Sequence, residues 1–364
     1  MKTYPYSHSP IEFLFTQTPR DFVVQEVPLY LASGEGEHLM IEVRKKSLST
    51  PELIKIFSST LSIPIKEIGY AGLKDKNALT TQYLTIPKTA QNKLSLLNET
   101  NIKILSTNLH NNKIRIGHLK GNKFFIRLKK VAKNDMQKIS QILEKIRVYG
   151  IPNYFGFQRF GKFGDNYLEG KALIEGKKKI RDKKLALFLI SSYQSHLFNL
   201  WLSQRIKLNR LMSDFKGKDL EMALRLQSLP PLKNPDTRQE HPFKLLKGDL
   251  MHHYPYGKLF ALDNIESEAK RFVQKDISPC GILSGKKITL PTDDALIYQE
   301  KFLDPAINEI GSHRFCWVFP EDLEYRYIEE KAHLELHFYL PKGSYATILL
   351  ETLANKEIKG ESDV

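Results

Sequence analysis

The sequence predicts an α+β fold with a mostly antiparallel mixed sheet. Two kinds of segment support this: runs that alternate between apolar and polar residues, and separate runs with a helical apolar stripe. Long apolar runs typical of buried parallel strands are missing from the pattern. The chain has 364 residues, which suggests two or three domains and at least one sizeable core.

The first 150 residues mix strand and helix patterns. Residues 37–46 alternate, with Leu39, Ile41 and Val43 on one face. A helix is predicted to open at Thr50, which can cap it, with Pro51 in its first turn. Its apolar stripe consists of Leu53, Ile54, Phe57 and Leu61. We predict further strands at 82–86, 113–116 and 123–131, and a helix at 135–149.

The pattern changes after residue 150. We predict helices at 165–176, 183–209 and 293–303, with a long irregular region at 230–291. Residues 319–353 then return to a strand, a turn and a helix. This order predicts a domain at 150–318 that is inserted into a sheet-containing domain formed by 1–149 together with 319–364.

Charge points to a polyanionic partner. The formal net charge is +14 and the isoelectric point is about 9.4. Such an excess favours nucleic acid, with an anionic membrane surface as the alternative. Lysine is abundant throughout the chain, so charge alone does not choose between a specific partner and a generally basic surface.

A cytoplasmic location is the expectation. The two cysteines, Cys280 and Cys316, have no metal-ligand spacing and fit a reducing compartment. The first ten residues contain no apolar leader segment. Residues 185–204 lack charge and are long enough for a membrane span, but their central serines, His196 and Asn199 favour a buried helix.

Residues 70–82 carry the strongest candidate for chemistry. Asp75 lies between Lys74 and Lys76 in a segment without apolar periodicity, just before a predicted strand. Nearby cations favour the ionised carboxylate, which is a better nucleophile than a general acid. Judged by charge pattern alone, a solvated Lys-Asp-Lys surface is the more common explanation.

Three other segments contain residues that suit RNA. Residues 120–134 include six basic and no acidic residues beside Phe124 and Phe125, as in an RNA-binding strand or a lysine-protected edge strand. Residues 152–161 place Gln158 and Arg159 among four aromatic rings, which suits base contacts or a packed hinge. Residues 340–347 form a Gly-Ser turn before a helix, which suits an anion site or an ordinary turn.

Together these segments resemble the TruD family of pseudouridine synthases, which convert uridine 13 of transfer RNA to pseudouridine. The matching segments are AGLKDKNALTTQ, KGNKF, PNYFGFQRFG, DFVV and LPKGSYAT. They occur in the family's order between about residues 20 and 350. The resemblance implies a pseudouridine-synthase catalytic domain with an inserted α/β domain, the TRUD domain.

The resemblance also implies site residues. Asp75 matches the catalytic aspartate, and the pocket residues are Phe22, Asn122, Phe124 and Tyr345. We further predict substrate contacts from Lys74, Lys76, Gln158 and Arg159. By strand alternation Phe124 shares a face with Ile126 and Leu128, which is a core face unless Phe124 lies at the strand end.

One position departs from the family pattern. Where members often carry a lysine shortly before the P-x-D-F block, this chain has Thr16. The cation that pairs with Asp75 is therefore open among Arg20, Lys74 and Lys76.

The expected reaction needs no cofactor. It breaks an N-glycosidic bond, turns the base and rejoins it through carbon, so substrate and product are isomers. We predict transfer RNA as the partner, no metal, no nucleotide cofactor, no membrane and a monomeric state. The alternatives are a non-catalytic RNA-binding protein or tRNA folding chaperone, and a hydrolase, for which a second carboxylate is missing from the pattern.

Overall fold

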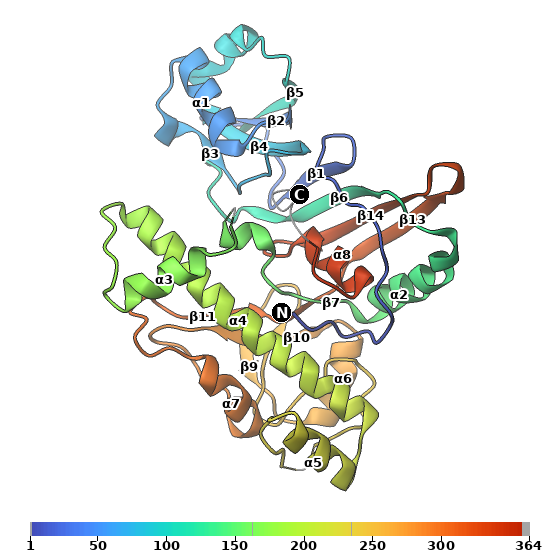
Figure 1. The fold of residues 1–364 in the computed structure, drawn as a ribbon. Coiled ribbons are helices and arrows are strands. Elements are labelled where there is room, and N and C mark those ends of the chain that lie inside the picture. The colour runs from blue at the N-terminus through green and yellow to red at the C-terminus, as the bar shows by residue number, and fades with distance from the viewer. Residues whose placement is uncertain (1, 162, 234, 359–364) are drawn as a thin grey trace. The chain divides into compact units, whose positions relative to one another are not determined.

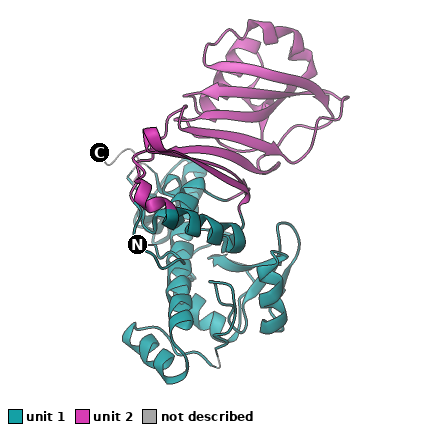
Figure 2. Ribbon diagram, turned by 90° about the vertical axis from the view of Figure 1, so that its right-hand side faces the viewer, with its two compact units in different colours: residues 1–11, 137–319, 344–364 teal, residues 12–136, 320–343 magenta. Residues whose placement is uncertain are grey.

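The structure is a computed structural model that describes residues 2–161, 163–233 and 235–358. Its contacts divide the chain into two compact units (Figure 2). Unit 1 comprises 1–11, 137–319 and 344–364, and unit 2 comprises 12–136 and 320–343. The predicted domain boundaries at 150 and 318 stay a prediction, because contacts group segments by proximity and a domain is also a unit of folding.

Unit 2 is built on an eight-stranded sheet with the order β13-β14-β6-β1-β4-β2-β5, and β3 pairs with β4 (Figure 1). Only β1 and β4 are parallel, and all other pairs in this sheet are antiparallel. The predicted α+β fold with a mostly antiparallel mixed sheet is therefore confirmed. The strands are β1 (Phe22–Pro28), β2 (His38–Lys46), β3 (Gly69–Tyr70), β4 (Leu79–Pro87), β5 (Ile102–His110), β6 (Leu119–Leu128), β13 (Glu321–Ile328) and β14 (His333–Pro341).

Helix α1 (Thr50–Leu61) packs its predicted apolar stripe against β2 and β4. The N-terminal cap of α1 is Ser49. The prediction that Thr50 caps this helix is wrong. Ser49 and Glu52 form a reciprocal capping box, which satisfies two backbone N–H groups at this end. Thr50, one residue later, is free to turn its hydroxyl towards β4.

The prediction of a strand at 113–116 is wrong. That segment is a connection between β5 and β6, and β5 itself lies earlier, at Ile102–His110. Asn111, Asn112 and Gly117 bracket the segment, and Gly117 has a positive φ of 91°, so the backbone turns at both ends. The backbone N–H of Ile114 donates to the Thr85 hydroxyl instead of to a neighbouring strand.

Unit 1 is organised around the 32-residue helix α4 (Lys183–Asp214), with α3 packed along it (Figure 1). A four-stranded sheet, ordered β11-β10-β8-β9, and the short pair β7–β12 complete its β structure. The helices are α2 (Met136–Tyr149), which begins at the border of the unit, α3 (Asn166–Ile174), α5 (Gly217–Leu226), α6 (Ile265–Val273), α7 (Asp293–Gln299) and α8 (Ala346–Ala354). The strands are β7 (Ile151–Pro152), β8 (Leu250–His253), β9 (Leu259–Ala261), β10 (Ile277–Leu283), β11 (Ser312–Phe315) and β12 (Trp317–Val318).

The region 230–291, predicted to be irregular, contains β8, β9, β10 and α6. Strand β10 reads ISPCGIL, and six of its seven residues are buried, so it shows no alternation. Gly281 within it lies against the Trp201 ring of α4, where any side chain would collide. The prediction that 185–204 form a buried helix is confirmed for the half of α4 that carries Phe198, Trp201 and Leu202. Among the described residues, none of the helices is long and apolar enough to cross a membrane.

A buried ion pair on α4 gives a prediction about stability. Arg205 donates two hydrogen bonds to the Asp249 carboxylate, at 2.7 and 2.9 Å, and both side chains are buried. Asp249→Asn leaves the Arg205 charge buried without a counter-charge, so we expect unfolding in urea to become easier by about 3 kcal/mol. The control is Asp236→Asn, which breaks an ion pair with the exposed Arg238 and is expected to cost under about 1 kcal/mol. Equal losses in the two variants would contradict this.

Candidate active site

Asp75 lies on the loop between β3 and β4, and buried groups hold the residue before it. The Lys74 backbone N–H donates to the Thr50 hydroxyl at 2.9 Å, and that hydroxyl donates to Gln82 at 2.9 Å. The Lys74 ammonium forms a buried ion pair with Glu26 of β1 at 2.5 Å. Groups from β1, β4 and the start of α1 therefore hold the residue immediately before Asp75.

Lys45 holds Asp75 itself. Its ammonium donates to the backbone carbonyl of Asp75 at 3.1 Å and to that of Leu48. Lys45 is fully buried on β2, and this burial lowers the pKa of its ammonium to about 8, although the nearby Asp75 charge raises it. This contact could not be predicted from the sequence, because Lys45 is one of several basic residues at the end of an alternating strand.

Asp75 is exposed, while its backbone carbonyl is held by the buried Lys45. Desolvation by the surrounding protein raises the pKa of Asp75, and attraction to Lys45 and Lys74 acts in the opposite direction. The pKa of Asp75 is raised overall, so the prediction that the neighbouring cations dominate is wrong.

The three cations considered as partners of Asp75 are engaged in other ways. Lys74 pairs with Glu26, and Lys76 pairs with Glu52 at 2.9 Å on the surface. Arg20 is exposed, and its carbonyl accepts a hydrogen bond from Arg127. The cations that influence the Asp75 carboxylate are Lys45 and Lys74.

Thr16, at the position of the expected lysine, donates its hydroxyl to Asp21 at 3.2 Å. Asp21 is buried at the start of β1 and also accepts hydrogen bonds from Thr18 and Lys129. Burial raises the pKa of Asp21, but these hydrogen bonds outweigh it and lower the pKa overall. Thr16 thus contributes to a structural network around Asp21.

Phe22, Phe124 and Phe338 form a row of aromatic rings across β1, β6 and β14. The ring centroids are 6.3 Å apart between Phe22 and Phe124 and 5.3 Å apart between Phe124 and Phe338. All three are buried, so Phe124 does share the core face with Ile126 and Leu128. Their contact with a substrate base stays a prediction.

Asn122 lies on β6, two residues before Phe124, and is half-buried. Its side-chain oxygen is buried and accepts no hydrogen bond from any described residue. A buried acceptor without a donor costs free energy, so this atom is suited to an incoming polar group.

In unit 1 the structure brings Gln158 and Arg159, from the 3₁₀ turn Phe157–Phe160, close to Tyr345 at the start of α8. A Cβ built on Gly156 would lie 2.8 Å from the Gln158 side-chain oxygen, 2.9 Å from the Tyr345 ring and 3.0 Å from the Thr347 hydroxyl. Only glycine fits there, and these three side chains converge on it.

The polar atoms of this cluster are largely unsatisfied. The oxygens of Gln158, Ser344 and Thr347 are buried and have no hydrogen-bond partner among the described residues. Thr347 was missed from the sequence, although it follows the predicted Gly-Ser turn closely. Arg314, which lies over the ring of Phe155 in the same cluster, was also missed, because residues around it show no motif.

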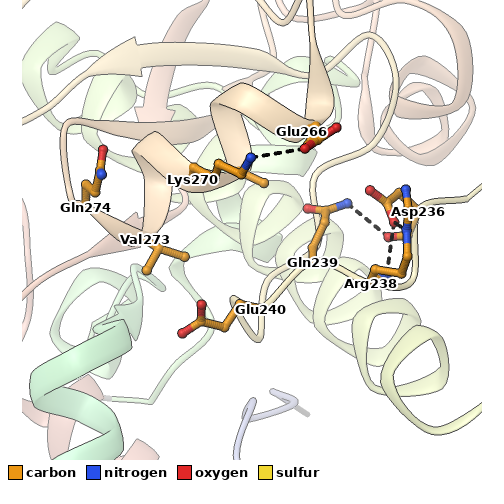
Figure 3. A pocket seen from close by; sticks show the side chains of 9 residues that line it. Asp236, Arg238, Gln239, Glu240, Glu266, Lys270, Val273 and Gln274 are labelled. Carbon is orange, nitrogen blue, oxygen red and sulfur yellow. Dashed lines mark hydrogen bonds and ion pairs between the residues drawn. The ribbon is translucent and has the colours of Figure 1, made fainter.

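A cavity of about 470 Å³ lies elsewhere in unit 1, between residues 236–240 and α6 (Figure 3). Lys270 pairs with Glu266 at 3.0 Å, and Arg238 pairs with Asp236 at 3.1 Å (Figure 3). Glu240, which also lines the cavity, accepts a hydrogen bond from Tyr149, and none of the predicted site residues lines this cavity.

Comparisons with known proteins decide the family. A sequence model described as tRNA pseudouridine synthase D (TruD) matches residues 1–181. The tRNA pseudouridine synthase D of Wolinella succinogenes is 52% identical over 360 residues, covering 98% of this chain and 99% of the relative. The chain belongs to the TruD family. The TruD protein of Sulfurimonas denitrificans is 51% identical over 355 residues, covering 98% of this chain and 99% of the relative.

A solved TruD structure supports the fold. The crystal structure of a Methanosarcina mazei protein assigned to TruD superimposes with a TM-score of 0.69, covering 97% of this chain and 96% of that chain. Its sequence is only 19% identical, so this likeness concerns the fold alone. The resemblance inferred from five short segments is thus confirmed over the whole chain.

Lys45 gives a prediction with a definite pH dependence. Its pKa is about 8 in the folded chain and about 10.4 when unfolded, so the cost of burying the ammonium is largest below pH 8 and falls as pH rises towards 10. We expect the unfolding free energy of the wild type, relative to Lys45→Met, to rise by about 2 kcal/mol between pH 7 and pH 10 in urea titrations. Lys46→Met, which removes an exposed ammonium from the same strand, controls for loss of charge. A relative stability that is flat or falls with pH would rule this out.

Proposed function

We propose that this chain isomerises uridine to pseudouridine at position 13 of transfer RNA, with Asp75 as the catalytic nucleophile. The observation that carries the proposal is the exposed Asp75 on a loop whose backbone is held by Thr50 at Lys74 and by Lys45 at Asp75. The TruD relatives are named tRNA pseudouridine synthase D, which describes the same reaction class and substrate class. A held carboxylate suits catalysis because little reorganisation is needed when the substrate arrives.

The reaction requires one nucleophile and a base that has left its stack. Asp75 attacks either the ribose C1′ or the base C6, or helps to remove a ribose proton, and the substrate and product have the same atoms. Extruding a base from its stack costs a few kcal/mol, and stacking on an aromatic ring returns about 1–3 kcal/mol. In unit 2 we assign the rings of Phe22 and Phe124 to contact with the base, and Asn122 offers its unsatisfied oxygen to the nucleotide. In unit 1 we assign the ring of Tyr345 to contact with RNA.

The remaining predicted residues contact RNA in different ways. Lys76 has an exposed ammonium, which suits a phosphate. Gln158 and Arg159 belong to the unit 1 cluster around Tyr345. Lys74 is paired with Glu26, so we assign it chiefly to holding the Asp75 loop. A cytoplasmic location and a monomeric state stay predictions from the sequence.

Asp75→Asn tests the catalytic assignment. The amide has the same shape but is a poor nucleophile, so we expect pseudouridine formation in a single-turnover assay to fall at least about 10³-fold. Affinity for transfer RNA is expected to change by less than about threefold, because one exposed carboxylate contributes little to phosphate binding. Mass mapping of the product identifies the modified position.

The matched control is Glu99→Gln, which neutralises an exposed carboxylate elsewhere in unit 2 and is expected to react like the wild type. Turnover by Asp75→Asn close to that of the control would remove Asp75 from the mechanism. If Asp75→Asn lost both its affinity for transfer RNA and its turnover, the substitution would have displaced the loop.

A further inference from the structure

Two guanidinium groups lie around one aromatic ring in unit 1. The Arg314 guanidinium carbon is 3.9 Å from the centroid of the Phe155 ring, and that of Arg159 is 5.8 Å from it. Tyr345 packs edge-on against the same ring, at 6.1 Å between centroids. Two cations and a tyrosine therefore share one small region of the unit.

Neutral groups hold both arginines in place. Arg159 donates to the hydroxyls of Ser195, at 3.1 Å, and Ser191. Arg314 donates to the Asn153 backbone carbonyl at 3.1 Å and to its side-chain oxygen at 2.8 Å. No carboxylate of the described part of the chain forms an ion pair with Arg159. Arg159 is thus oriented by neutral hydroxyls, and its charge has no carboxylate partner among the described residues.

The electrostatics of the pair favour an anion. Burial lowers the pKa of Arg314 to about 10, and the neighbouring Arg159 charge lowers it further while Tyr345 acts in the opposite direction. Burial also lowers the pKa of Arg159. Two partly desolvated like charges repel each other, and an anion bound near both offsets that repulsion. A guanidinium fork matches the oxygens of a phosphate.

The surroundings favour a phosphate that belongs to a nucleotide. The buried oxygens of Gln158, Ser344 and Thr347 have no partner among the described residues, and they lie beside Tyr345. A base can stack on the tyrosine ring and donate its N–H groups to these oxygens. A free inorganic anion would use the arginines only and would leave these acceptors unsatisfied.

We propose that Arg159 and Arg314 together bind one phosphate of the substrate RNA, and that Tyr345 and Gln158 contact the nucleoside next to that phosphate. The inference deepens the proposed function and rests on it for the identity of the RNA. It adds Arg314 to the residues that contact RNA, and it assigns a single phosphate to both arginines.

The test is the salt dependence of transfer-RNA binding by the full chain, measured by filter binding for Arg159→Gln, Arg314→Gln and the double variant. Each single change is expected to weaken binding about tenfold at physiological salt. Because the two arginines share a phosphate, the double variant loses less than the product of the single losses. Its slope of log affinity against log salt falls by about one and not by two.

Arg271→Gln is the matched control. It removes a guanidinium that also lies over a phenylalanine ring, Phe260, at 5.8 Å, and so changes net charge and packing in the same way. We expect it to bind transfer RNA like the wild type. Arg314→Lys keeps the charge but loses the fork, and it is expected to recover less than half of the lost binding free energy. Thermal melting confirms that each variant is folded.

Several outcomes would overturn the phosphate site. In the first, the single variants bind transfer RNA like Arg271→Gln. In the second, the affinity losses of the two single variants multiply in the double variant, and its slope of log affinity against log salt falls by two. In the third, Arg314→Lys recovers all of the lost binding free energy. Millimolar inorganic phosphate, titrated at constant ionic strength, is expected to leave binding unchanged. Displacement of the RNA by it would show a site for the free anion.

Pseudouridine formation by the wild type, measured in parallel, separates the two proposals. If the wild type is active and the arginine variants bind normally, only the phosphate site is wrong. If the wild type forms no pseudouridine but the arginine variants lose affinity as described, the phosphate site stands and the proposed function fails.

Discussion

The buried ion pair between Lys74 and Glu26 is the interaction on which the candidate catalytic loop depends. Both charges are almost fully removed from water, and each would be costly to bury without the other. Glu26 lies on β1 and also accepts a hydrogen bond from the backbone of Tyr83 on β4, at 3.3 Å. The pair therefore joins the residue before Asp75 to the two parallel strands in the middle of the sheet.

Two further buried side chains hold the loop through its backbone. Lys45 and Thr50, at the two ends of the connection from β2 to α1, bind the backbone of Asp75 and Lys74. The side chains of Glu26, Lys45, Thr50 and Lys74, which hold the loop, are buried, while Asp75 is exposed. A reactive group on a supported loop keeps its position without losing access to substrate.

Buried cations in this molecule are held in two different ways. Lys74 and Arg205 each have a carboxylate partner within the protein, and their ion pairs serve the fold. Arg159 is held by serine hydroxyls and lies near a second guanidinium, that of Arg314. This contrast distinguishes the ion pairs that stabilise the fold from the two arginines that we propose to bind a phosphate.

The sequence alone determined what depends on local pattern: the α+β class, helices α1, α2 and α4, strand β14, the family, and Asp75 as the candidate nucleophile. Tertiary structure decided which atoms meet, because the partners lie far apart in the chain, as with Glu26 and Lys74, or Arg314 and Phe155. It also decided β10, which is buried on both faces and so has no alternation to detect. Periodicity reports which face of an element is buried, whereas ion pairs and hydrogen bonds depend on distances that only the folded chain sets.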